Sequence, residues 1–211
     1  TVTGSFTITI TAVNDKPSFT GGPNQETLED SKTQTVTNWA TNLYKGPSDE
    51  SGQMLTFSVT ANSNTALFTT AGKPAISPTG TLTYTPADNA FGTATVTIKL
   101  MDNGGTSNGG VNTSSTYTFT ITVLPVNDQP TFSDSGNVTV KEDSGAYSAA
   151  WASNPNVGPP NESQTHTYVL QNVTVDSLAG NTSLFSAGPA IDAQTGALTF
   201  TPAENASGTA T

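Results

Sequence analysis

The residues of this chain that could do chemistry are mainly carboxylates and amides. Asp and Glu number 16 against six lysines, arginine and cysteine are absent, and the formal net charge is −10. Divalent cations are the natural partners of such a chain, because hard cations prefer oxygen ligands. Nucleic acid and anionic membrane surfaces are not expected partners, since both are bound through basic patches. Direct membrane insertion is not expected either, because no apolar run reaches about 18 residues.

The acids and amides recur in pairs that are spaced alike in two parts of the chain. Local hydrogen bonding could explain such residues, because Asp, Asn and Ser favour turn and cap positions. Their recurrence, together with the net acidity, favours a metal site over that explanation. The matching pairs are Asn14-Asp15 with Asn127-Asp128, Glu29-Asp30 with Glu142-Asp143, and Asp49-Glu50 with Asn161-Glu162.

The elements that must position these residues are strands of an internal repeat. Residues 6–19 read F-T-I-T-I-T-A-V-N-D-K-P-S-F and residues 119–132 read F-T-I-T-V-L-P-V-N-D-Q-P-T-F, an offset of 119 − 6 = 113. Apolar residues alternate with threonine, which is the period of a strand with one buried face. Pro17 and Pro130 end these strands, because proline cannot donate a ladder hydrogen bond.

A repeat of this length predicts whole domains rather than short solenoid units. We expect residues 1–15 to be the last strand of a preceding repeat, 16–128 to be a complete repeat, and 129–211 to be a second repeat that stops before its last two strands. No signal peptide is recognisable, so we expect a segment of a larger protein or a mature segment. No window carries a helical apolar stripe, and strand-forming and turn residues abound, which predicts an all-β protein.

The same inventory of residues argues against an enzyme. His166 is the only histidine. It aligns with Leu55 of the first repeat, so we expect a partly buried structural imidazole rather than a metal ligand. With one histidine and without cysteine or arginine, we do not expect a nucleophile–base pair of the usual parts. A glycosidase-like pair of carboxylates is formally available, but short repeated sandwiches offer it no deep cleft.

Five landmarks follow one another in a fixed order, and most of them occur twice. They are the joint V-N-D-x-P, then E-D, then D-E-S-G-Q-x-L-T-F, then G-T-L-T-Y-T-P-A-x-N-A-x-G, and a strand that ends in D-N-G-G. Over essentially its whole length the chain therefore resembles the tandem cadherin-like and bacterial immunoglobulin-like repeats of large cell-surface adhesins. The resemblance implies tandem Greek-key β-sandwiches arranged end to end.

The resemblance also implies that calcium rigidifies each joint between repeats. A joint where three segments converge can deliver the roughly six to eight oxygens that calcium needs. At the first joint these would come from Asn14 and Asp15 in the linker, Asp49 and Glu50 in a loop, and Asp102 after the penultimate strand. At the second joint they would come from Glu29 with Asp30 beside it, Asn127, Asp128, Asn161 and Glu162.

Both linkers depart from the full cadherin pattern D-x-N-D-N. Ala12 or Pro125 stands at its first Asp, and Lys16 or Gln129 at its last Asn. We therefore expect one or two ions rather than three, bound with the weak affinity of about 10⁻⁴ to 10⁻³ M that extracellular modules show. The second joint should be the weaker one, because Asn161 replaces Asp49 there.

A different class of function stays open, in which the repeats themselves bind a glycan or a copy of the same protein. Threonine ladders such as Thr7, Thr9 and Thr11 could form a flat binding face, although alternating threonine is commonly the wet face of a strand. Trp39 and Trp151 recur at equivalent places, within strand-like stretches. We expect them to be core residues whose indole N–H groups reach a partner at the rim, rather than platforms for sugar rings.

The expected function is accordingly structural. We expect stalk or spacer repeats of an extracellular adhesin or surface filament on the cell surface, with neighbouring repeats as the main partners. As a further alternative, residues 1–13 of a neighbouring molecule could supply a missing strand and build head-to-tail filaments.

Overall fold

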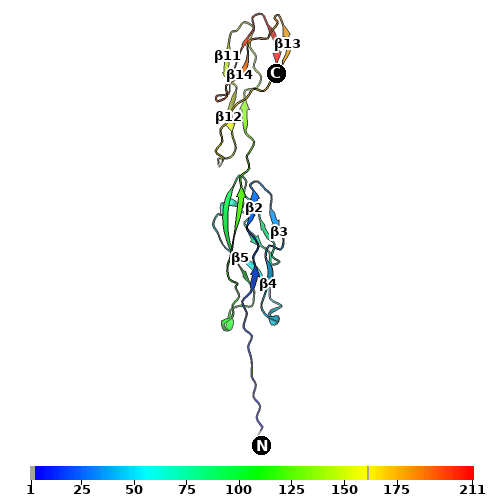
Figure 1. Cartoon of the computed structure of the whole chain (residues 1–211), viewed down its shortest axis with the longest axis vertical. Helices are drawn as coiled ribbons and strands as arrows, with labels where there is room; N and C mark the ends of the chain where they lie inside the picture. The colour runs from blue at the N-terminus through cyan, green and yellow to red at the C-terminus, as the bar shows by residue number, and fades with distance from the viewer. Residues whose placement is uncertain (1–2, 161) are drawn as a thin grey trace. The chain divides into compact units, whose positions relative to one another are not determined.

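The structure is a computed structural model of the 211 residues, described for residues 3–160 and 162–211. It divides into two compact units, unit 1 (Thr1–Val126) and unit 2 (Asn127–Thr211). Strands dominate both units (Figure 1), so the expected all-β class is confirmed. Helical elements in the described ranges are the short 3-10 turns η1 (Ser48–Glu50), η2 (Thr65–Leu67) and η3 (Ser107–Gly109). Within those ranges, no helix has the length and apolar character needed to cross a membrane.

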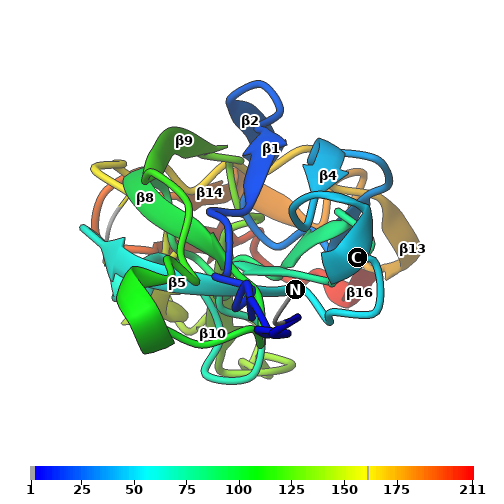
Figure 2. The ribbon, with the colours of Figure 1, turned by 90° about the horizontal axis from the view of Figure 1, so that it is seen from below.

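Unit 1 contains a four-stranded sheet, a three-stranded sheet and a two-stranded ribbon. Neighbouring strands are antiparallel except β2 and β9, which are parallel, and Figure 2 shows β8 and β9 side by side. The larger sheet has the order β2 (Gln25–Leu28), β9 (Tyr117–Leu124), β8 (Gly92–Met101), β5 (Thr56–Asn62). The second has the order β3 (Gln34–Val36), β7 (Leu82–Tyr84), β6 (Ala75–Ile76), and the ribbon pairs β1 (Ser18–Thr20) with β4 (Thr41–Tyr44).

One hydrophobic core holds unit 1 together. Inward-facing residues alternate with threonine along β8 and β9, so that each strand buries one face, as the period-2 pattern predicts. Side chains from the three-stranded sheet, including Leu82 and Tyr84, pack against Val96 and Ile98 of β8. A core shared by two sheets is consistent with a β-sandwich.

Trp39 belongs to this core, as its recurrence in the sequence predicts. Its ring lies 4.4 Å, centroid to centroid, from that of Phe119, and its indole N–H donates to Pro23 O at 2.9 Å. It lies in the turn between β3 and β4, however, and not in a strand, so that part of the expectation is wrong. Trp151 is only half-buried; its N–H donates to Gly136 O at 2.8 Å.

Unit 2 repeats most of these pairings. Its three sheets pair strands that correspond, through the internal repeat, to β1 with β4, β3 with β7 and β6, and β5 with β8. Among its described residues, no strand stands in the place of β2 or of β9. The sheets are β10 (Thr131–Asp134) with β12 (Ala152–Asn156), then β11 (Tyr147–Ala150), β15 (Ala197–Pro202) and β14 (Phe185–Ile191), then β13 (Val175–Ala179) with β16 (Ser207–Ala210).

We predict that Ile98→Ala destabilises unit 1 by about 2–5 kcal/mol, because it empties space in a close-packed core. Ile98 is fully buried in β8, whereas Thr95 on the same strand is exposed. The matched control Thr95→Ala should therefore change the free energy of unfolding by less than about 0.5 kcal/mol. Urea unfolding followed by circular dichroism measures both changes, and equal losses in the two variants would contradict this description of β8.

The turn between β14 and β15 is closed by Asp192. Its Oδ1 accepts hydrogen bonds from the Thr195 backbone N–H (2.7 Å), the Thr195 hydroxyl (2.8 Å) and the Gln194 backbone N–H (3.1 Å). These bonds, that of the Thr195 backbone above all, hold the pKa of the Asp192 carboxyl below its ordinary 3.8, because they favour the ionised form.

We predict that Thr195→Val raises the pKa of Asp192 toward its ordinary value, since one donor is lost, while Thr195→Ser leaves it low. A carboxyl pKa lowered by folding stabilises the fold above the unfolded pKa, and this contribution disappears as the pH falls through the folded pKa. Thr195→Val should therefore lose less stability than the parent on acidification. An NMR titration of the Asp192 carboxyl tests this, and an unchanged pKa in Thr195→Val is the opposing result.

Candidate metal site

Asn14 ties the N-terminal segment to unit 1. Its backbone O accepts the Val111 N–H at 2.9 Å. Its side-chain Nδ2 donates to Asp102 Oδ1 and to Val111 O, both at 3.0 Å. Asp102 directly follows β8, and Val111 lies in the loop that leads to β9. Asn14 therefore connects the segment that enters unit 1 with the end of the central hairpin.

Glu50 fixes the next residue of that segment. The Asp15 backbone N–H donates to Glu50 Oε1 at 2.8 Å. Glu50 ends η1, whose first turn also contains Asp49. The two acids are adjacent in sequence but differ in the structure, because Glu50 is buried and Asp49 is exposed. The Asp15 side chain is exposed as well.

Gln53 completes the cluster and was missed by the sequence analysis. Its Nε2 donates to Asn14 Oδ1 at 2.7 Å. Gly104 lies so close to Asn14 and Gln53 that a Cβ at this position would meet both side chains, and its N–H donates to Asp102 Oδ1 at 2.9 Å. A signal was available in the sequence: a glutamine follows the glutamate at short spacing in both repeats, as Gln53 and as Gln164.

The cluster presents oxygens that no donor satisfies. Glu50 and Asp102 are 7% and 6% exposed. Glu50 Oε2, Asp102 Oδ2 and Gln53 Oε1 are buried without a hydrogen-bond partner in the described structure. A buried carboxylate that is only half satisfied is costly, and a hard cation bound by these oxygens would remove the cost. These oxygens are of the kind that calcium prefers, although three of them are fewer than the roughly six to eight it takes.

Carboxylates alone do not complete such a site. Over residues 3–160 and 162–211, no three Asp, Glu, His or Cys side chains gather closely enough to hold a metal ion. Amide oxygens would have to contribute, as they commonly do for calcium. In this cluster the candidates are Asn14 and Gln53, beside the carboxylates of Glu50 and Asp102.

Glu29 and Asp30 lie at the opposite end of β9 and have different roles. Glu29 is 2% exposed, its Oε1 accepts the Val126 N–H at 2.8 Å, and its Oε2 lacks a partner in the described structure. Asp30 is exposed, has a positive φ of 57°, and accepts the Asn89 N–H at 2.7 Å. Glu29 thus shares the features of Glu50, whereas Asp30 lies in a turn and connects it to the distant loop of Asn89.

Unit 2 contains a similar arrangement around Asp128. The Asp128 N–H donates to Glu162 Oε1 at 3.1 Å, as Asp15 does to Glu50. Gln164 Nε2 donates to Asn127 Oδ1 and, at 2.8 Å, to Glu162 Oε2. Asp128 Oδ2 is buried without a partner in the described part of the chain. Asn161, the remaining expected ligand, lies outside the described residues.

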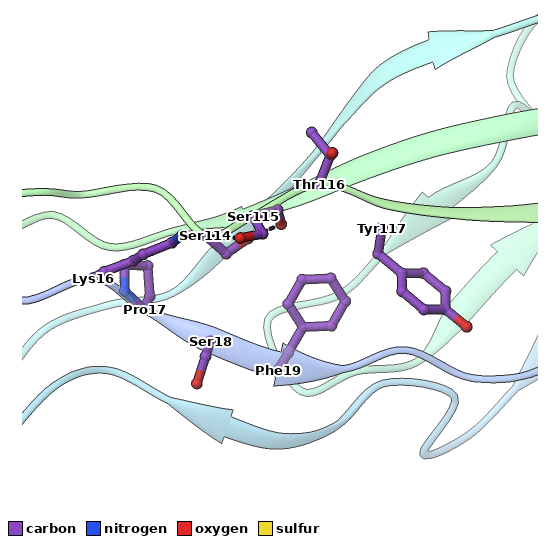
Figure 3. A pocket seen from close by; sticks show the side chains of 8 residues that line it. All are labelled: Lys16, Pro17, Ser18, Phe19, Ser114, Ser115, Thr116 and Tyr117. Atoms are coloured by element: carbon purple, nitrogen blue, oxygen red, sulfur yellow. Dashed lines mark hydrogen bonds between the residues drawn. The ribbon is translucent and has the colours of Figure 1, made fainter.

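Unit 1 also contains a shallow groove (Figure 3). It encloses about 320 Å³ between residues 16–19 and 114–117, with the rings of Phe19 and Tyr117 6.1 Å apart. Its charged side chain is Lys16, whose ammonium donates to Ser115 Oγ at 2.9 Å. The groove brings together no acid and base. His166, in unit 2, is half-buried beside Tyr168 at 5.3 Å between ring centroids.

Comparisons with known proteins add a structural likeness. No protein-family model matches this chain, and no curated protein matches it. Among solved structures, the crystal structure of the human desmocollin-1 ectodomain is similar at a TM-score of 0.34 and 16% sequence identity. The match covers 90% of this chain and 34% of that chain, so the present chain spans about a third of the ectodomain's length.

Proposed function

We propose that this chain is part of the stalk of an extracellular adhesin or surface filament, and that calcium clamps the segment entering unit 1. The observation that carries the proposal is the set of buried, partnerless oxygens on Glu50, Asp102 and Gln53. The same three side chains hydrogen-bond the linker, at Asp15 and at Asn14, through their other polar atoms. Such a site would not convert a substrate. Its effect would be to hold the chain at Asn14-Asp15 in one direction.

Each residue would have a separate task in this clamp. Glu50 and Asp102 would supply negative charge from two different loops, and Gln53 a neutral oxygen. Asp15, exposed at the surface of the cluster, would reach the ion from the linker. Bound calcium would offset the repulsion between the carboxylates and resist bending at Asn14-Asp15. Without the ion, the same repulsion loosens the linker.

Repetition supports a spacer role. The contact between a linker N–H and a loop glutamate occurs in both units, at Asp15 with Glu50 and at Asp128 with Glu162. In a stalk, every unit needs a contact that fixes the linker leading into it. A ligand-binding module needs only one binding site. Trp39 is buried and its N–H is already bonded, so it offers no platform to a sugar ring.

We predict that calcium stabilises the parent chain and that Asp102→Asn abolishes most of the effect. Calcium at about ten times its Kd adds about 1.4 kcal/mol to the free energy of unfolding. Asn at position 102 keeps the acceptor for Asn14 but removes the charge, so in EDTA this variant should be at least as stable as the parent. Calorimetry with and without calcium gives both comparisons.

The matched control is Asp88→Asn, which removes an exposed carboxylate outside the cluster. It should respond to calcium as the parent does. A parent chain whose melting temperature ignores millimolar calcium, or an Asp88→Asn chain that loses the response, would overturn the proposed clamp.

We also predict that Gly46→Ala weakens calcium binding. Gly46 has φ +134°, and a Cβ there would overlap Glu50 Oε2, so the substitution displaces the carboxylate and strains the backbone by about 1–3 kcal/mol. Isothermal titration with calcium should show a higher Kd. Gly52→Ala, which meets nothing within 4 Å, serves as the control, and equal affinities in the two variants would be inconsistent with a ligand role for Glu50.

A further inference from the structure

The loop between β8 and β9 contains both Asn-Gly pairs of this sequence, and the structure holds the two pairs differently. Residues 102–111 read D-N-G-G-T-S-N-G-G-V, with the pairs at Asn103-Gly104 and Asn108-Gly109. A second glycine follows each pair, so the local sequence gives the two asparagines nearly the same chemistry. Both side chains are exposed to solvent. A difference in their reactivity must therefore come from their contacts in the fold.

An Asn-Gly pair is reactive because the glycine nitrogen can attack the asparagine side chain. Glycine has no Cβ, so its nitrogen approaches the side-chain amide carbon without a clash. The nitrogen forms a bond to Cγ and loses its proton, while the side-chain amide leaves as ammonia and a five-membered succinimide ring closes. Water then opens the ring at either carbonyl and gives aspartate or isoaspartate. One water is consumed and one ammonia is released, and neither oxidant nor reductant is needed.

The pair Asn103-Gly104 is held away from this reaction by three contacts. The Asn103 Oδ1 atom accepts the Met54 N–H at 2.8 Å, and the Gly104 N–H donates to Asp102 Oδ1 at 2.9 Å. Gly104 is also packed so tightly that a Cβ at this position would overlap the Asn14 side chain. Ring closure requires the amide and the glycine nitrogen to leave these partners together, so the fold protects this pair.

The pair Asn108-Gly109 has no such restraint. It lies in η3, where Asn108 has a φ of 55° and Gly109 a φ of 89°. The side chain of Asn108 makes no hydrogen bond in the described part of the chain, and a Cβ at Gly109 would meet nothing within 4 Å. The left-handed conformation is unfavourable for a residue with a side chain. Rotation of Asn108 toward the attacking nitrogen therefore breaks no side-chain contact.

We propose that Asn108 is a site of spontaneous deamidation in the folded chain, and that its isoaspartate form loosens the linker at Asn14. Isoaspartate routes the main chain through its side-chain carbon. The loop thereby becomes longer by one carbon atom and also gains a carboxylate. Aspartate, the other product, adds the charge but leaves the length of the main chain unchanged.

The loop that contains Asn108 is the one that holds Asn14. Its turn is closed by the Gly110 N–H, which donates to Ser107 O at 3.0 Å. Val111 donates its N–H to Asn14 O at 2.9 Å and accepts from Asn14 Nδ2 at 3.0 Å. Gly110 lies against Asn14, since a Cβ added to it would be 3.0 Å from the Asn14 Cβ. An additional main-chain carbon at position 108 widens this turn and displaces Gly110 and Val111, so isoaspartate weakens the hold on Asn14.

The reaction makes the entry to unit 1 dependent on the age of the molecule. It accelerates as the pH rises, because the glycine nitrogen must lose its proton to form the ring. Unlike the binding of an ion, it is not undone by dilution. An effect on calcium rests on the proposed function: if calcium clamps the linker at Asn14, an aged chain responds to calcium less than a fresh one.

The first test follows both asparagines in one molecule. The full chain is kept warm at mildly alkaline pH and digested at intervals, and the peptides are measured by mass spectrometry after labelling of isoaspartate with an isoaspartyl methyltransferase. We expect Asn108 to react at least about tenfold faster than Asn103, because two hydrogen bonds must break before Asn103 can react. In urea the unfolded chain loses these contacts, and the two rates should become equal.

Two results of this test would overturn the proposal. One is an equal rate at Asn103 and Asn108 in the folded chain. The other is a folded chain in which Asn108 stays intact over the time in which the unfolded chain is converted.

The second test measures the hold on Asn14 through the Val111 N–H, whose hydrogen exchange is followed by NMR. Protection of this N–H should be lost in the aged parent. Asn108→Gly cannot deamidate and suits a positive φ, so its exchange should not change with age. Asn108→Asp adds the charge without lengthening the main chain and should exchange as the fresh parent does. An aged parent that contains isoaspartate but keeps Val111 fully protected contradicts the proposed loosening.

Both tests are run in EDTA, so their outcome does not depend on a metal ion. Fresh and aged chains are then titrated with calcium. Reaction at Asn108 with loss of protection at Val111, together with no calcium response in either chain, supports the modification and counts against the metal clamp alone. A calcium response that is smaller in the aged parent, and unchanged by age in Asn108→Gly, supports both.

Discussion

The antiparallel pairing of β8 with β9 is the interaction on which the rest of unit 1 depends. It runs without interruption from Gly92 opposite Val123 to Ile98 opposite Tyr117. An uninterrupted ladder keeps the alternation of side chains in register, so one face of both strands is entirely apolar and closes the core. The ladder also sets the positions of the residues that follow its two strands. Asp102 follows one strand and Val126 follows the other, so the polar clusters at the two ends are consequences of this pairing.

Carboxylates occupy both ends for a physical reason. Where a ladder stops, backbone N–H groups of the incoming and outgoing chain lose their strand partners, and a buried donor without a partner is costly. Glu50 and Glu29 each satisfy one such group, at Asp15 and Val126. A glutamine could accept the same bonds without a buried charge. The second oxygen of each carboxylate lacks a partner in the described structure, which leaves room for the ligand proposed above.

Much of the fold could be predicted from the sequence, because it depends on local period and on repetition. Alternation identified β9 and its buried face, and recurrence identified Trp39 as a core residue. The candidate site was predicted less well, since it depends on contacts between distant loops. Asp49 and Glu50 look equivalent in the sequence, yet η1 turns only Glu50 inward. Gln53 was missed because its role exists only through Asn14, which lies far away in the chain.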